Sequence, residues 1–137
     1  MDTEGLFAPE TAEAARERYD ALGPTAQTVV REVTRAMAFD AAEYDDRVSS
    51  EVVETARDAL FASMLEVRVG TRAEFDEWRE ATEYAVTVEG SENVDNAVWH
   101  VAPFAEEAVA ATYHEKRRAA VATLRRQAFG RIYREVV

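Results

Sequence analysis

Hydrophobic residues in the first half of the chain recur every three or four positions, which is the spacing of one face of a helix. The pattern predicts four helices, which cover residues 9–22, residues 25–38, a short turn opened by an Asp40/Glu43 capping box, and a segment capped by Ser49 or Ser50 that ends at about residue 64. Residues 1–8 precede the first helix and are predicted to be a frayed lead-in.

After residue 64 the pattern changes to an alternation of period two, which is typical of strands. Residues 65–69 are predicted to form a strand that ends at Gly70, and Thr71 with Glu74 forms a capping box for the next helix. Residues 84–88 and 97–102 are predicted to pair as a hairpin through the turn that joins them. The result is a small three-stranded sheet with one intervening helix.

The chain from Pro103 onward contains no other proline and only one weak helix breaker, Gly130. This segment predicts a helix to about residue 134, or ~45 Å for about 30 residues, whereas the expected radius of gyration is only about 14 Å. Such a helix either kinks near Gly130 or projects and packs against a partner. The expected fold is therefore α+β and predominantly helical, in a single domain over residues 1–137.

The predicted C-terminal helix carries more apolar surface than one packing seam needs, together with a concentration of arginine. This surface is a candidate interaction face, with a second copy of the chain or another cytosolic protein as its partner. Its residues are Arg117, Arg118, Val121, Leu124, Arg125, Phe129, Ile132 and Tyr133.

The charge of the chain is strongly negative, with 27 acidic and 16 basic residues and a net charge of −11. Of the basic residues 15 are arginine, and alanine and valine dominate the apolar set with 26 and 17 residues. Self-repulsion of this size is weakened by concentrated salt, which also strengthens apolar burial. The composition therefore indicates a halophilic protein, although a GC-rich coding bias would also favour alanine, arginine and valine.

Several classes of protein lose support from the residues that are missing. The absence of cysteine excludes disulfide scaffolds, cysteine-ligated metals and thiol catalysis. The five glycines are isolated, so no glycine-rich phosphate loop or nucleophile elbow is present. The acidic start and the lack of a long apolar run predict a cytoplasmic protein without a signal peptide or a membrane span.

Three stretches of the sequence resemble an uncharacterised haloarchaeal protein family, domain of unknown function 5809. They are residues 22–27 (LGPTAQ), residues 55–71 (TARDALFAS followed, after Met64, by LEVRVGT) and residues 122–133 (ATLRRQAFGRIY). The resemblance covers nearly the whole chain and implies a haloarchaeal origin and a cytosolic setting. It implies no activity, ligand or catalytic residue.

The basic residues of the C-terminal segment leave two interpretations open, because residues 101–137 hold seven basic and four acidic residues. In the first, the arginines form ion pairs with carboxylates on the acidic helices of the same chain or of a partner. In the second, they bind the phosphates of a nucleic acid while Tyr113, Phe129 and Tyr133 stack on bases. Binding that depends on counterion release weakens steeply as salt rises, which favours the first interpretation.

A third interpretation is a small enzyme that uses His100 or His114 with nearby carboxylates, and it predicts that both imidazoles line one pocket. Neither histidine belongs to a short metal-binding motif. The sequence therefore predicts no metal, cofactor or catalytic residue. It favours a non-catalytic interaction or oligomerisation module that uses the C-terminal helix.

Overall fold

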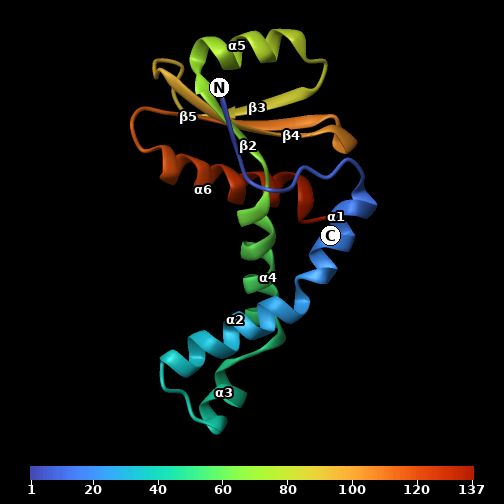
Figure 1. Ribbon diagram of the computed structural model, residues 1–137, viewed down its shortest axis with the longest axis vertical. Helices are drawn as coiled ribbons and strands as arrows, with labels where there is room; N and C mark the ends of the chain where they lie inside the picture. The colour runs from blue at the N-terminus through green and yellow to red at the C-terminus, as the bar shows by residue number, and fades with distance from the viewer.

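The computed structural model describes residues 1–137 and divides into an upper head, built around a β-sheet, and a lower arm of helices (Figure 1). We define the arm as residues 23–54 and the head as the rest of the chain. The arm extends away from the sheet, so the molecule is elongated (Figure 1).

The four predicted N-terminal helices are all present. They are α1 (Ala12–Ala21), α2 (Gly23–Ala36), α3 (Ala41–Arg47) and α4 (Ser50–Met64). The side chains of Asp40 and Ser49 accept hydrogen bonds from the backbone N–H groups of Glu43 (2.8 Å) and Val52 (3.4 Å), as N-cap residues do. The first helix starts three residues later than predicted because Thr11, and not the segment at Pro9, supplies its cap.

The sheet has five strands, not the three that were predicted. They are β1 (Asp2–Glu4), β2 (Val67–Thr71), β3 (Ala85–Glu89), β4 (Asn96–Ala102) and β5 (Glu107–Tyr113), in the spatial order β1-β2-β4-β5-β3. Only β3 and β5 run parallel, and the other neighbours are antiparallel. The lead-in expected to be frayed therefore contains an edge strand, and β5 inserts between β3 and β4, which were expected to pair.

The predicted start of the C-terminal helix at Pro103 is wrong, because Pro103–Ala105 form only a single 3₁₀ turn, η1. Glu106 then adopts a left-handed conformation (φ 52°) and returns the chain into β5. Both faces of β5 are covered, so its sequence lacks the alternation that marks a half-exposed strand. Its three alanines also have high helix propensity, which explains the error.

A long C-terminal helix is nevertheless present. Helix α6 (Arg117–Ala128) continues directly into a π-helical turn, η2 (Phe129–Tyr133), in which the N–H of Arg134 donates to the carbonyl of Phe129 at 2.9 Å. The wider turn coincides with Gly130, close to the predicted kink. None of the helices combines the length and the apolar character that crossing a membrane would require.

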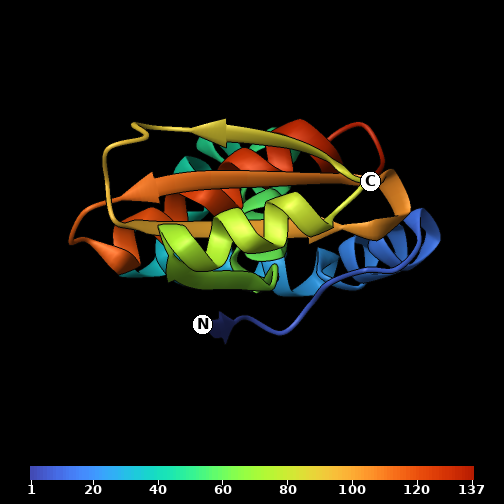
Figure 2. The ribbon, with the colours of Figure 1, turned by 90° about the horizontal axis from the view of Figure 1, so that it is seen from above.

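Helix α5 (Arg72–Ala81) covers one face of the sheet, and α6 covers the other (Figures 1 and 2). Thr71 and Glu74 form the predicted capping box of α5. On the α5 side, Phe75, Trp99 and Ala110 belong to a small apolar cluster. The opposite face belongs to the main core, where the ring of Phe61 on α4 meets the rings of four other aromatic residues: Phe7, Tyr19, Phe129 and Tyr133.

The arm has much less of a core. Helix α2 packs along α4 and buries Ala26, Val30 and Thr34, none of which belongs to either apolar cluster of the head. Helix α3 buries no residue at all. In the arm, α2 therefore packs against a single helix, α4, and its outer surface is largely exposed to solvent.

Candidate functional site: an arginine-lined groove

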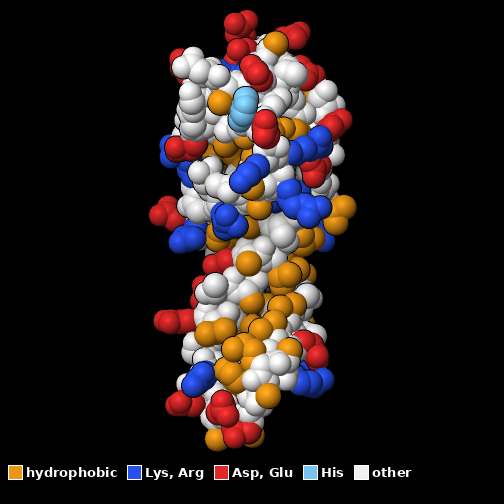
Figure 3. Space-filling model, turned by 90° about the vertical axis from the view of Figure 1, so that its left-hand side faces the viewer, with side chains coloured by type: hydrophobic (Ala, Val, Ile, Leu, Met, Phe, Trp, Pro, Cys, Tyr) orange, Lys and Arg blue, Asp and Glu red, His pale blue; other side chains and the backbone are white.

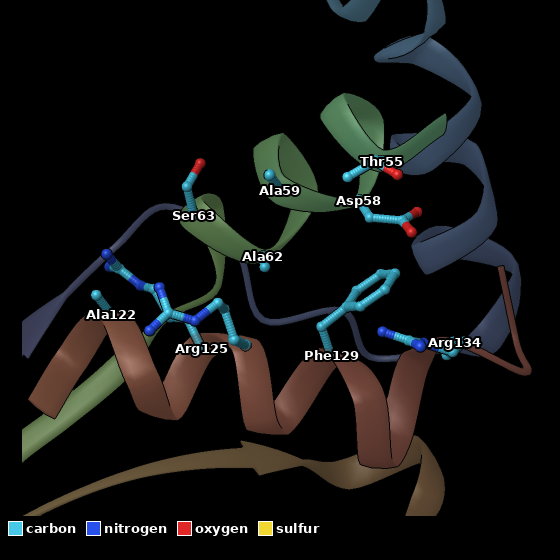
Figure 4. A pocket seen from close by; sticks show the side chains of 10 residues that line it. Thr55, Asp58, Ala59, Ala62, Ser63, Ala122, Arg125, Phe129 and Arg134 are labelled. Atoms are coloured by element: carbon cyan, nitrogen blue, oxygen red, sulfur yellow. The ribbon is translucent and has the colours of Figure 1, made fainter. Parts of the chain in front are cut away.

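A groove of about 480 Å³ separates α4 from α6 where the arm joins the head (Figure 4). Helix α4 contributes one wall, and α6 with the residues that follow it contributes the other. Its lining consists of Thr55, Asp58, Ala59, Ala62, Ser63, Ala122, Arg125, Arg126, Phe129 and Arg134. The floor is thus made of small side chains and one aromatic ring, and three arginines stand around it.

Small residues on α4 explain why this space is open. Thr55, Ala59, Ala62 and Ser63 follow one another at helical spacing, so they share one side of α4. Phe61 points to the other side and fills the core. The α4 helix can therefore pack on the head through Phe61 while leaving room in front of its small side chains.

Arg125 is held in place by the backbone. Its Nε–H donates to the carbonyl of Leu65 at 2.9 Å, the residue that ends α4. A guanidinium has five N–H donors in a fixed plane, so this bond orients the group and uses only one donor. The Nη groups of Arg125 are left for another partner.

Arg134 lies at the opposite end of the groove, beside Phe129 (Figure 4). Its Cζ atom is 5.7 Å from the centroid of the Phe129 ring, within the range of a cation–π contact. Arg126 lies on the exposed side of α6, and its only hydrogen bond is a long one of 3.4 Å to Thr123 Oγ1. Neither arginine is held by a carboxylate.

Asp58 is the only acidic residue of the groove. Its Oδ1 accepts a hydrogen bond of 2.6 Å from the hydroxyl of Tyr19, so this carboxylate already has a partner on α1. Burial raises the pKa of Tyr19 and the bond to Asp58 raises it further, which keeps the phenol protonated as the donor.

The ion pairs of the arginines lie elsewhere: Arg35 with Glu32, Arg72 with Asp76, and Arg117 with Asp2 and Glu4. Within the chain, none of the C-terminal arginines pairs with the acidic helices, because Arg117 binds carboxylates of strand β1. Pairing with a partner's helices stays a prediction. At 3.0 Å from Asp2 and 2.8 Å from Glu4, Arg117 bridges β1 to the start of α6. The three groove arginines have no carboxylate within 4.0 Å.

A second hollow of about 570 Å³ continues from the groove toward the start of α6. The two share Ala122 and Arg125, and the second adds Arg117 and Arg118 together with Val121 and with Glu4, the ion-pair partner of Arg117. Basic side chains therefore line a continuous depression along α6. In the view of Figure 3 they gather at the level of this helix, above the arm.

The predicted interaction face is divided by the structure. Its charged members are accessible, since Arg117 and Arg118 are exposed and Arg125 lines the groove. Its apolar members are not available to a partner, because all five are at most 5% exposed and belong to the main core: Val121, Leu124, Phe129, Ile132 and Tyr133. Sequence periodicity could not show this, because the extra apolar strip covers the sheet and α4.

The two histidines lie apart from the groove and in opposite environments. His114 is on the exposed turn before α6, whereas His100 is fully buried in β4. His100 Nδ1 lies 2.6 Å from the carbonyl of Glu66, which can only accept, so Nδ1 carries the proton. Nε2 then accepts the hydroxyl proton of Tyr133 at 2.6 Å.

Desolvation lowers the pKa of His100, and Arg125 and Arg68 lower it further, so the imidazole is neutral. Burial raises the pKa of Tyr133. The pair is a hydrogen-bonded part of the core, and neither imidazole lines either of the two hollows described above. No group of three or more His, Asp or Glu side chains that could hold a metal ion is present in residues 1–137.

The α4 wall of the groove was missed by sequence reasoning. Its signal was the row of small residues from Thr55 to Ser63, but the meaning of that row depends on which helix faces it. Arg134 was not included in the predicted interaction face, and the π-helical turn that precedes it and sets the direction of its side chain was not predicted either.

Comparison with curated proteins and with solved structures finds no match. The model of the family described as "Family of unknown function (DUF5809)" matches residues 6–134, so the chain belongs to this family.

Proposed function

We propose that this protein is a non-catalytic interaction module that holds a carboxylate-rich segment of a protein partner in the groove between α4 and α6. One observation carries the proposal. In a chain with 27 acidic residues, Arg125, Arg126 and Arg134 converge on one hollow and none is paired with a carboxylate.

The chemistry of the groove suits a side chain that is anionic at its tip and apolar along its stem. Guanidinium groups bind carboxylates through two parallel N–H···O bonds, and such charge-assisted bonds are roughly twice as strong as neutral ones. Ala59 and Ala122, which are exposed, offer apolar contact beside the arginines. Glutamate side chains of a helix or an extended peptide match both requirements.

The size and the surroundings of the groove suit a short peptide segment better than a long polyanion. A volume of about 480 Å³ accommodates a few side chains. The arm beside the groove is acidic, with seven acidic and three basic residues between positions 23 and 54. A nucleic acid that extended beyond the groove along the arm would meet this negative charge.

A binding role is also supported by where the candidate catalytic groups lie. His100 is in the core and His114 is on a turn outside the groove. Asp58 already accepts the Tyr19 hydroxyl. The hydroxyls of Thr55 and Ser63 already donate to the backbone carbonyls of Glu51 (2.9 Å) and Leu60 (2.7 Å).

The test uses a fluorescein-labelled helical peptide in which one helical turn of glutamates alternates with one turn of alanines. The uncharged control is the same peptide with glutamine in place of glutamate. Fluorescence anisotropy is measured in about 2 M KCl, where nonspecific charge attraction is screened over about 3 Å or less. We expect saturable binding of the glutamate peptide. The double variant Arg126→Gln/Arg134→Gln should weaken it at least about tenfold.

The matched control is Arg79→Gln/Arg131→Gln, which removes the same charge from two exposed positions outside the groove. It should leave the affinity unchanged. Equal binding of the glutamine peptide, or equal losses in both double variants, would contradict the proposal. Tighter binding of a single-stranded oligonucleotide than of the glutamate peptide would replace it with the nucleic-acid interpretation.

A further inference from the structure

The arm displays an uncovered row of large apolar side chains. Val29, Val33 and Met37 are spaced four residues apart along α2 and are 37%, 52% and 60% exposed, and Val52 at the start of α4 is 41% exposed. On the opposite side α2 buries only small or medium side chains against α4. The apolar row is therefore a second seam that the monomer leaves in water.

The tip of the arm is acidic and equally uncovered. Residues 40–46 contain four carboxylates and no basic residue: Asp40, Glu43, Asp45 and Asp46. None of them forms an ion pair in the molecule, and α3 buries no side chain. Asp40 accepts the N–H of Glu43 as the cap, which leaves the other three free to bind a cation.

One face of the molecule shows these features in a fixed order along its long axis (Figure 3). Basic side chains gather at the level of α6, hydrophobic side chains run down the arm below them, and acidic side chains stand at the lower end, with a few basic side chains beside them. A rotation of 180° about an axis through the middle of the arm reverses this order. It places apolar on apolar and acidic on basic at both ends.

We propose that two copies of this chain associate antiparallel through their arms, and that the α3 tip of each copy supplies the carboxylates bound in the α4–α6 groove of the other. The inference rests on the proposed function, since it names the partner of that groove. Each groove is incomplete without the second copy. Such an interface is isologous, because the same patch serves both subunits and closes on itself.

The dimensions of the helices are compatible with this arrangement. Helix α2 has 14 residues, or ~21 Å at about 1.5 Å per residue. The groove begins on α4 at Thr55, five residues from the start of that helix, or ~8 Å by the same rise. When two arms lie antiparallel and side by side, the tip of each arm therefore lies next to the groove of the other copy. The α2 and α4 helices of the two copies then form a four-helix bundle around a shared apolar seam.

The first measurement is the mass of the full chain by light scattering in about 2 M KCl, where apolar contacts persist. We expect twice the 15.3 kDa of one chain. Val33→Ser/Met37→Ser should raise the dimer dissociation constant at least about tenfold. Leu6→Ser, at a position 85% exposed in the head, is the matched control and should leave it unchanged.

A charge exchange tests which surfaces meet. Asp45→Arg/Asp46→Arg places positive charge against the partner's arginines, and Arg126→Glu/Arg134→Glu places negative charge against the partner's tip. Each double variant alone should be monomeric. Mixed in equal amounts they should form a heterodimer, because each tip then meets a groove of the opposite sign, and this recovery also shows that both variants are folded.

The outcomes separate this inference from the proposed function. A wild-type monomer that still binds the glutamate peptide would overturn the dimer and leave the function standing. A dimer that depends on Val33 and Met37 but ignores both charge variants, with no peptide binding, would overturn the assigned occupant and the function together. Displacement of the dimer by the glutamate peptide would support both.

Discussion

The head and the arm are made from the same kinds of residues, but the head buries its apolar side chains more completely than the arm does. In the head, a sheet covered on both faces places its apolar side chains in two clusters, and even His100 and Trp99 are fully buried. In the arm, α2 buries three side chains against a single helix and leaves Val29, Val33 and Met37 in water. An alanine- and valine-rich composition therefore does not by itself provide a core; a second layer must be present to cover the apolar face.

The surface expected to associate with a partner is on the arm and not on the head. The apolar strip of α6 suggested an interface, but the head uses that strip for itself. The corresponding strip of α2 has no neighbour. The surface left for a partner is thus the one whose covering element is missing.

Hydrogen exchange should show the largest contrast between the two regions. We expect amides of β4 and β5 to exchange only on global unfolding, with protection of about 10³-fold or more. Amides of α3 should exchange through local opening, with protection of less than about tenfold. The measurement is made by mass spectrometry on dilute protein in concentrated KCl. Equal protection of α3 and β4 in the monomer would remove the distinction, and a rise in α2 protection with concentration would favour the dimer.

Truncation of the aromatic centre of the head should have the next largest effect. Phe61→Ala removes a fully buried ring that meets four aromatic neighbours, and we expect the free energy of unfolding to fall by about 3–5 kcal/mol. Val30→Ala in the arm removes a side chain that is 6% exposed but outside both clusters, and it should cost about 1–2 kcal/mol. Urea unfolding of both variants measures the difference, and similar costs would mean that the arm is packed as tightly as the head.

Acid should act on the head through His100. Burial lowers the pKa of His100 in the folded protein, whereas in the unfolded chain this histidine has its ordinary pKa of 6.5. Below pH 6.5 the unfolded chain therefore binds a proton that the folded chain does not bind. The free energy of unfolding is therefore unaffected by His100 above this pH. Below it, the free energy of unfolding falls by up to about 1.4 kcal/mol per pH unit.

The control for this effect is His100→Asn, whose amide can still donate to the carbonyl of Glu66 but does not titrate. The difference in unfolding free energy between the two proteins, measured from about pH 7.5 to 5.5, isolates the contribution of the histidine. Parallel pH profiles would show that the imidazole can take up a proton inside the core.

The smallest predicted effect concerns the end of α2. Ala38 has a φ of 58°, and its N–H and that of Phe39 donate to the carbonyls of Arg35 (2.9 Å) and Thr34 (3.0 Å), which is a Schellman ending with alanine where glycine is preferred. Ala38→Gly should stabilise the arm by about 1 kcal/mol. Ala36→Gly, two residues earlier in helical conformation, should destabilise it by roughly 0.5–1 kcal/mol. If both changes destabilised the protein, the left-handed conformation at Ala38 would be disproved.

Local signals in the sequence predicted the parts of the fold that depend on neighbours along the chain. The caps at Asp40, Ser49 and Thr71 form hydrogen bonds with residues three positions away, so their chemistry can be read directly. The alternation around Val67 and Val69 was likewise sufficient to identify β2, although the strand begins two residues later than predicted.

Features that depend on distant partners were not predictable in this way. Strand β5 lost its alternation because both of its faces are buried, and Asp2–Glu4 became a strand because β2 offered an edge. The groove required α4 and α6 to meet, which no periodicity within either helix could reveal. Arg125 was named from its charge alone, whereas its bond to Leu65 joins positions 60 residues apart.

The π-helical turn after α6 sets the phase of everything that follows it. One additional residue in a turn shifts all later side chains by about 100° relative to an uninterrupted α-helix. Here the shift brings Tyr133 to His100 and Arg134 to the ring of Phe129. A relative lacking one residue in this turn would present a different side chain to the buried imidazole, so the length of this turn matters as much as its chemistry.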